Sequence, residues 1–265
     1  MTDETEIDAS KAPLMEHLIE LRKRLLWCLG ALLVAFGIAF TQAQRIFDFL
    51  VRPLGEAFGP GPGGQLIYTK LYEAFFVDIK VSLFAAFVLA FPVIANQLWA
   101  FVAPGLYKRE RNAFLPFLIA TPILFTMGAA LAYYVVMPMA FRFFLGFQHG
   151  GGTSGVAQTA LPAMGDYLAL VMQFIIAFGV AFLLPVLLML LERAGIVSRR
   201  QLIGARRYAI VGATVIGAVL APPDIGSQLA LAVPLIVLYE ISIVAIWFTE
   251  KRRARAAVGM PTAAE

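Results

Sequence analysis

The chain has 265 residues, of which 60% are hydrophobic and only 14% are charged. Soluble domains carry about 25% charged residues, so these proportions, with a mean hydropathy of +0.81, exclude a soluble protein and predict one that crosses a membrane several times. The net charge is +4. The basic residues cluster at the ends of apolar runs without interleaved aromatic residues, which argues against a nucleic-acid partner.

The N-terminus carries acidic residues (Asp3, Glu4, Glu6 and Asp8) where a signal peptide would carry basic ones. We therefore expect residues 1–13 to form a disordered acidic tail and the first apolar run to be retained. That run, Leu25 to Gln44, contains about 20 residues and is long enough to cross the hydrocarbon core.

Further charge-free runs predict an all-α membrane protein with six transmembrane helices in one domain over residues 1–265. The expected spans are 25–44, 81–107, 112–141, 167–191, 208–221 and 228–248, with a tail over 250–265. The last two are short and are joined at Pro222-Pro223-Asp224, because proline cannot continue a helix. Prolines inside several spans predict a kinked, concave bundle.

Six spans place both termini on one side of the membrane. Most of the 21 Lys and Arg residues fall on that side, so we expect both termini to be cytoplasmic.

The segment just before the first span places Glu20 among Arg22, Lys23 and Arg24. The three cations can be topology signals that hold this end of the helix in the cytoplasm. Alternatively, a carboxylate among cations at a membrane surface can bind a short charged peptide through charge-assisted hydrogen bonds. The segment alone leaves both readings open.

Small residues recur every four positions in the fifth span, which allows another helix backbone to approach closely. The ridge consists of Ala209, Ala213, Gly217 and Ala221. Spacing alone leaves open whether a span of the same chain or a partner's helix packs on it.

Other patterns exclude several classes of chemistry. Two histidines in no recognised metal spacing and a single cysteine, Cys28, predict no metal, cofactor or internal disulfide.

The Gly152-Thr153-Ser154-Gly155 segment matches the serine motif of rhomboid intramembrane proteases. Here it lies in a Gly-rich loop, with His149 on the same loop instead of a separate helix. We therefore expect no enzyme.

Four long motifs, in order and in register, resemble the TatC family, the multi-spanning subunit of the twin-arginine protein translocase. The resemblance covers roughly Leu14 to Phe248. The motifs are His17 to Leu25, Trp99 to Arg111, Ala177 to Val180 and Pro222 to Gln228. It implies a receptor for the twin-arginine signal peptides of folded proteins, driven by the proton-motive force in the bacterial inner membrane.

Matched position by position, the resemblance implies functional residues in this chain. The signal-peptide site falls on Glu20, Arg22, Lys108 and Glu110, with Phe101 and Pro92 shaping it. It further implies that Pro53 and Asp224 matter on the outer side. The chain departs from the family pattern at Leu183, where many relatives carry Glu or Gln, and at Ala221, where relatives carry Thr.

The resemblance also implies partners: the single-span subunits TatA and TatB, the lipid bilayer and other copies of the chain. If the small-residue ridge faces lipid, we expect it, with Gln228, to contact the TatA or TatB helix. The alternative is a secondary transporter of a small solute, for which Glu240 is the candidate intramembrane carboxylate. The short final hairpin instead predicts that Glu240 pairs with Arg206 or Arg207 at the cytoplasmic boundary.

Overall fold

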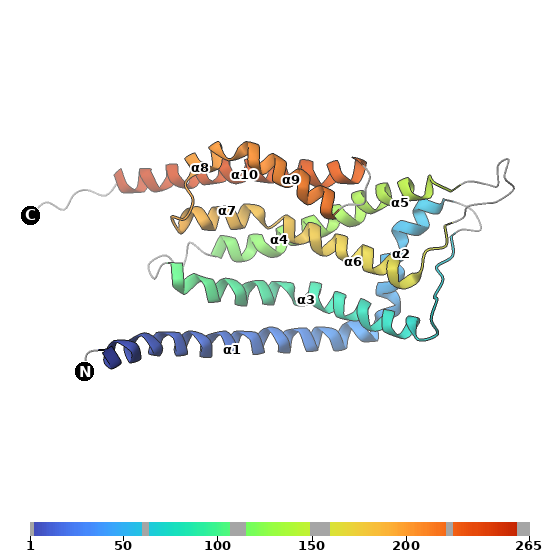
Figure 1. Cartoon of the computed structure of the whole chain (residues 1–265), viewed down its shortest axis with the longest axis horizontal. Coiled ribbons are helices and arrows are strands. Elements are labelled where there is room, and N and C mark those ends of the chain that lie inside the picture. Colours follow the sequence, from blue (N-terminus) through green and yellow to red (C-terminus); the bar gives the residue numbers. More distant parts are fainter. Residues whose placement is uncertain (1–2, 60–63, 107–114, 149–159, 221–224, 259–265) are drawn as a thin grey trace, which may run out of the picture. The chain divides into compact units, whose positions relative to one another are not determined.

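The chain is almost entirely helical over the residues that the computed structural model describes, which are 3–59, 64–106, 115–148, 160–220 and 225–258. Within these ranges, one parallel β-bridge joins Ile67 to Ala163. The helices, labelled in Figure 1, are α1 (Asp3–Thr41), α2 (Ala43–Phe58), α3 (Glu73–Leu106), α4 (Leu115–Leu131), the π-helix η2 (Ala132–Val136), α5 (Met137–Leu145), α6 (Met164–Ala181), α7 (Leu184–Arg193), α8 (Arg199–Gly204), α9 (Arg206–Leu220) and α10 (Ile225–Val258).

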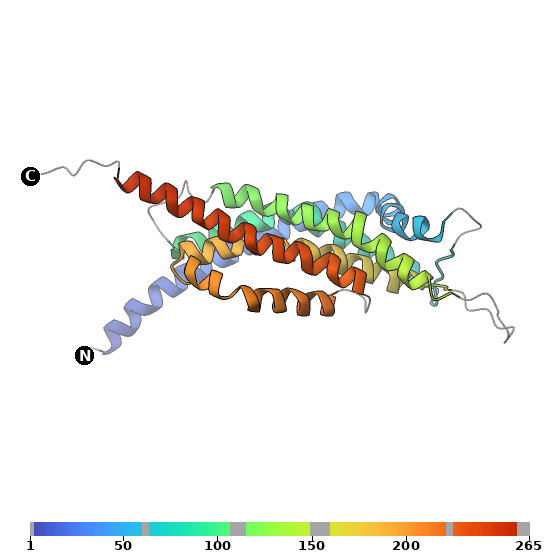
Figure 2. The same cartoon turned by 90° about the horizontal axis from the view of Figure 1, so that it is seen from above.

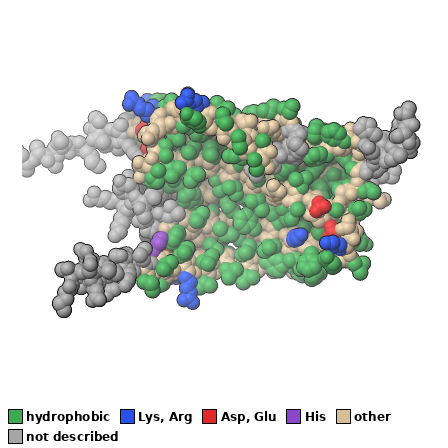
Figure 3. Space-filling view, viewed as in Figure 1, with side chains coloured by type: hydrophobic (Ala, Val, Ile, Leu, Met, Phe, Trp, Pro, Cys, Tyr) green, Lys and Arg blue, Asp and Glu red, His purple; other side chains and the backbone are tan. Residues whose placement is uncertain are grey.

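Five helical stretches among the described residues are long and apolar enough to cross a membrane. They are His17–Thr41, Glu73–Phe101, Phe117–Leu145, Met164–Arg193 and Gln228–Lys251. Hydrophobic side chains cover most of the surface shown in Figure 3, as a lipid-facing protein requires. The chain is therefore a multi-pass membrane protein. The fifth expected span, 208–221, corresponds to α9, whose 15 residues reach only about 22 Å, so the six-span count stays a prediction.

Both ends of the chain are more helical than expected. α1 begins at Asp3, within the segment expected to be a disordered tail, and α10 continues past Glu250 to Val258. Acidic residues early in a helix interact favourably with its positive N-terminal dipole, which supports the longer α1. The prediction of a cytoplasmic tail over 250–265 concerns location and stays a prediction.

The chain divides into two compact units, residues 1–50 with 70–122 and residues 51–69 with 123–265. The single domain over 1–265 stays a prediction. In the first unit, α1 and α3 lie side by side and run antiparallel (Figure 1). Their contact centres on three buried alanines, Ala35, Ala86 and Ala90, whose small side chains let the two backbones approach closely.

Two long spans of the second unit change their helical geometry at prolines. The π-helix η2 lies directly before Pro138, and the Met137 N–H reaches the Ala132 carbonyl. The fourth expected span is interrupted at Phe182 and Leu183, between α6 and α7 and just before Pro185. Proline has no N–H to donate to the carbonyl four residues earlier, so the backbone hydrogen bonds of the helix are rearranged there. Leu183 lies in this break, where its N–H donates to the Val180 carbonyl at 3.0 Å.

Two glycines let α4 and α6 approach within backbone contact in the second unit. A Cβ atom added to Gly128 would lie 2.3 Å from the Phe178 carbonyl oxygen, and one added to Gly179 would lie 2.5 Å from the Phe125 ring. The rings of Phe125 and Phe178 are themselves fully buried. No larger residue fits at either glycine without separating the helices.

The small-residue ridge on α9 is covered by α10 of the same chain. Figure 2 shows α9 running beside α10. Gly217 is buried, and a Cβ atom added there would lie 3.0 Å from the Gln228 carbonyl oxygen and 3.7 Å from Ala232 Cβ. Ala213 is also buried, while Ala221 lies outside the described residues.

This contact decides between the two alternatives that spacing left open. The ridge packs on a helix of the same chain at Ala213 and Gly217, so the condition for a TatA or TatB contact, a ridge that faces lipid, is not met there. Small residues bring together whichever helices meet, and here the next helix of the chain meets the ridge. Gln228 takes part in the same contact, because its Nε2 lies 3.4 Å from the Thr214 carbonyl oxygen.

The predicted pairing of Glu240 with Arg206 is confirmed, because Arg206 Nη2 donates to Glu240 Oε2 at 2.8 Å. The adjacent Tyr239 hydroxyl donates to the Leu202 carbonyl at 2.7 Å. Farther along α10, Arg199 Nε lies 3.5 Å from Glu250 Oε2. These contacts tie α8 and the start of α9 to α10.

We expect Gly128→Ala to lower the stability of the chain by about 1 to 3 kcal/mol, since overpacking a tight contact forces the backbones apart. The measurement is the thermal unfolding midpoint of the detergent-solubilised protein. Gly212→Ala is the matched control. That glycine lies inside α9 with no neighbour within 4 Å, so alanine should leave stability unchanged or raise it. Equal midpoints for Gly128→Ala and the parent would contradict the close approach.

We expect Arg206→Glu and Glu240→Arg to lower the unfolding midpoint singly, and the double substitution to recover most of the loss. Both side chains are more than one-third exposed, so the coupling should be small, about 0.2 to 1 kcal/mol. Arg207→Glu with Glu240→Arg is the control, because Arg207 donates to the Tyr208 hydroxyl instead. Additive losses in the first double variant would show that the pair does not interact.

Candidate functional site

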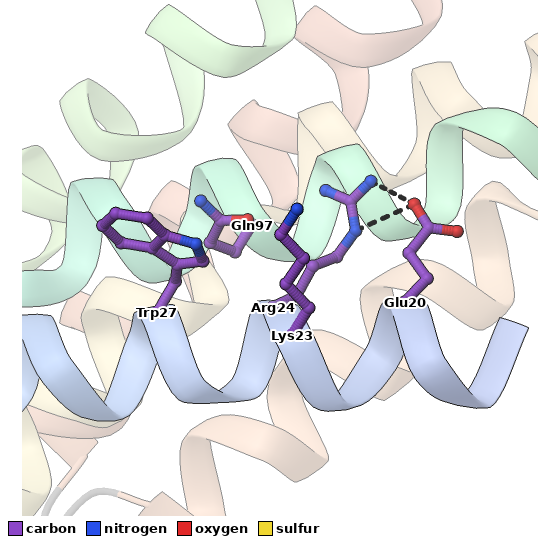
Figure 4. A pocket seen from close by; sticks show the side chains of 5 residues that line it. All are labelled: Glu20, Lys23, Arg24, Trp27 and Gln97. Atoms are coloured by element: carbon purple, nitrogen blue, oxygen red, sulfur yellow. Dashed lines mark hydrogen bonds and ion pairs between the residues drawn. The ribbon is translucent and has the colours of Figure 1, made fainter. Parts of the chain in front are cut away.

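A pocket of about 290 Å³ opens where the N-terminal part of α1 passes the C-terminal part of α3. It is lined by Glu20, Lys23, Arg24, Trp27 and Gln97. Figure 4 shows the α1 side chains rising from one side of that helix, with Gln97 facing them from α3. The site therefore belongs entirely to the first unit.

The antiparallel register of α1 and α3 brings these residues together. The alanine contact places Ala35 opposite Ala86 and Ala90. Continuing toward the start of α1 moves along α3 toward its end, so residues near 24 meet residues near 97. The His17 ring accordingly stacks on the Phe101 ring, with centroids 4.3 Å apart and planes 17° from parallel. This stack is a further contact between α1 and α3.

The Glu20 carboxylate is held on one side only. Arg24 donates to Oε1 through Nε, at 3.1 Å, and also through Nη2. The other oxygen, Oε2, has only His17 Nδ1 nearby, at 3.9 Å, which is beyond hydrogen-bonding distance. Among the described residues, Oε2 thus has no hydrogen-bond donor. The Glu20 side chain is 36% exposed, so a donor from outside can reach it.

A partly exposed carboxylate in this setting can bind a guanidinium. Arginine offers donors in a planar fork that matches the two oxygens of a carboxylate. The Arg24 pair is an i,i+4 contact on a helix surface, worth only about 0.3 to 0.5 kcal/mol. It orients the carboxylate and can be exchanged for a second arginine at little cost.

The α3 side of the site is anchored by Trp99. Its indole N–H donates to the Thr121 hydroxyl at 2.8 Å, and Thr121 donates to the Phe117 carbonyl at 2.7 Å. Thr121 is almost fully buried, so this bond is shielded from water. It connects α3 with α4.

The structure brings together some of the expected site residues and leaves others apart. Glu20 and Phe101 both lie beside His17: its Nδ1 is 3.9 Å from Glu20 Oε2, and its ring stacks on the Phe101 ring. Arg22 is exposed, and two positions along a helix do not face each other, so it does not line the pocket. Pro92 is exposed on α3. Lys108 and Glu110 lie outside the described residues.

The other expected residues that the structure describes belong to the second unit. Pro53 is buried in α2, and Glu240 is on α10, paired with Arg206. Asp224 lies outside the described residues. No group of three or more potential metal ligands occurs among the residues described.

Three lining residues were missed from the sequence, namely Arg24 as a partner of Glu20, Trp27 and Gln97. A signal for two of them was present. Residues 17, 20, 24 and 27 follow the three-and-four spacing of one helix face, so Arg24 and Trp27 had to share the face of Glu20. Gln97 gave only a weak signal, as an uncharged polar residue in a long apolar run.

Comparisons with known proteins agree with this architecture. The family described as Sec-independent protein translocase protein (TatC) matches residues 16–234. Curated relatives with that name come from Magnetococcus marinus (52% identical over 244 residues, 92% of this chain and 87% of that protein), Aquifex aeolicus (41% over 231 residues, 87% and 93%) and Escherichia coli K12 (41% over 231 residues, 87% and 86%).

Solved structures agree as well. A crystal structure of the twin-arginine translocase receptor TatC in the detergent DDM is similar with a TM-score of 0.72 and 41% identity. The similarity covers 86% of this chain and 98% of that one. The chain belongs to the TatC family of Sec-independent protein translocase proteins.

Proposed function

We propose that this chain is the receptor and core subunit of a twin-arginine protein translocase, and that it binds the signal peptides of folded proteins at its cytoplasmic face. The observation that carries the proposal is the Glu20 carboxylate, held on one side by Arg24 and accessible on the other. The twin-arginine motif supplies the charge that such a carboxylate binds best.

In this proposal, an arginine of the signal peptide replaces Arg24 on the Glu20 carboxylate. An incoming arginine donates first to Oε2 of Glu20, and Arg24 then turns away from Oε1 as the new guanidinium takes both oxygens. Lys23 and Arg24 repel a second arginine, so a second carboxylate must neutralise it. We assign that role to Glu110, with Lys108 and Arg22 limiting the site to peptides that carry both arginines.

The remaining roles follow from this assignment. The chain resides in the bacterial inner membrane with both termini in the cytoplasm, and α9 is its short fifth span. It assembles with TatA, TatB and other copies of itself, and export is driven by the proton-motive force. Pro53 and Asp224 act on the outer side. We propose no catalytic step, since transport of a bound protein requires none.

A secondary transporter of a small solute is less well supported. A proton-coupled carrier needs an ionisable group poised to titrate inside the membrane. The candidate, Glu240, instead accepts a hydrogen bond from Arg206 at a partly exposed position. We therefore do not propose the carrier.

We expect Glu20→Gln and Glu110→Gln each to weaken binding of a twin-arginine peptide tenfold or more. The neutral amide loses a charge-assisted interaction of about 1.5 to 3 kcal/mol. The measurement is fluorescence anisotropy of a labelled peptide with the purified chain. Glu56→Gln, an exposed glutamate on α2, is the control and should leave binding unchanged. Unaltered affinity in the Glu110 variant would remove that residue from the site.

In cells, deleting this chain should abolish export of a folded reporter that carries a twin-arginine signal. Reintroducing the chain should restore export, and the Glu20→Gln variant should restore it only weakly. A reporter with a Sec-type signal should be exported throughout. Export of the twin-arginine reporter without the chain would refute the proposed function.

A further inference from the structure

Trp27 lines the pocket and offers an apolar surface most of which no described residue covers. It lies on the same side of α1 as Glu20 and Arg24 (Figure 4), and the residue remains 63% exposed. Tryptophan brings a large apolar area together with one N–H donor. A site built only to hold arginine has no use for that apolar area.

The three tryptophans of the chain differ in how they are used. The Trp99 N–H is bonded to Thr121, and the Trp247 ring contacts Phe248 and lies under the Lys251 ammonium at 5.0 Å. Within the described residues, Trp27 has neither a hydrogen-bond acceptor for its N–H nor an aromatic or cationic partner. Trp99 and Trp247 are thus held by neighbouring side chains, whereas Trp27 borders a pocket.

The spacing from Glu20 to Trp27 suits a peptide lying along α1. Seven residues are two helical turns, about 10.5 Å, which is about three residues of an extended chain. Secretory signal peptides place an apolar region directly after their charged segment. With the arginines at Glu20, the first apolar residues therefore reach Trp27.

The order of Glu20 and Trp27 along α1 also matches their depth in the predicted span. Glu20 lies near the start of the span His17–Thr41, and Trp27 lies deeper in it. Gln97 faces the interval between them from α3, where its side-chain amide can bond the peptide backbone. Charge is therefore met at the rim and apolar surface farther in.

We propose that Trp27 is a specificity-determining subsite, which binds the first apolar side chain after the arginines of a signal peptide. This inference rests on the proposed function, because it takes the arginines to bind at Glu20. It adds a second requirement for recognition, set by Trp27 and independent of charge. A peptide with both arginines but polar residues after them binds less tightly.

The test is a two-by-two comparison with the purified full-length chain in nanodiscs. One labelled peptide carries Arg-Arg followed by leucines two to four positions after the second arginine, and the other carries serines at those positions. Against the parent chain, the leucine peptide should bind about tenfold more tightly, as expected for covering one large apolar side chain. Trp27→Ala should remove that advantage and leave the serine peptide unchanged, and Trp27→Phe should retain most of it.

Trp247→Ala is the matched control, because it removes an exposed tryptophan from another helix, and it should change binding of neither peptide. An equal loss for both peptides in Trp27→Ala, or a leucine advantage that persists in it, would overturn the inference. A Lys-Lys version of the leucine peptide separates the two proposals. If it binds the parent chain as well as the Arg-Arg version does and Glu20→Gln has no effect, the proposed function itself fails. If arginine and Glu20 matter but Trp27 does not, only the subsite fails.

Discussion

Backbone hydrogen bonding is the constraint on which this structure depends. In hydrocarbon no water can satisfy an N–H or carbonyl group, so each spanning segment must satisfy its own backbone. The helical stretches are long for this reason. Where proline removes a donor, the chain rearranges hydrogen bonds locally and does not unfold. The π-helix before Pro138 and the break before Pro185 are two such adjustments.

Once the backbone is helical, small residues decide which helices meet closely. Alanines do this between α1 and α3, and Gly217 does it between α9 and α10. Gly128 and Gly179 do it between α4 and α6. Without water there is little hydrophobic force between helices, so close van der Waals contact has to hold them together. A bulky side chain at any of these contacts costs more than it would at a lipid-facing position.

The α1–α3 contact forms the pocket in which a ligand can bind. Its register places a charged helix surface and the end of an apolar helix around one pocket, with Glu20 at the rim and Trp27 farther in. At the rim the charges remain partly hydrated, which keeps the Glu20–Arg24 pair weak enough to exchange. A fully buried carboxylate would be held too firmly, or would lose its charge, and could not accept an arginine from outside.

Composition and the apolar runs by themselves determined that this is a helical membrane protein. They also located Glu20 and the pairing of Glu240 with a neighbouring arginine, because span length places residues at a membrane boundary. The spacing of residues 17, 20, 24 and 27 was visible in the sequence, although their common pocket was not. Only the tertiary structure decided that α10 covers the small-residue ridge, and that Gln97 and Trp27 share a site with Glu20. Spacing along one helix describes a face, but which helix meets that face depends on how the whole chain packs.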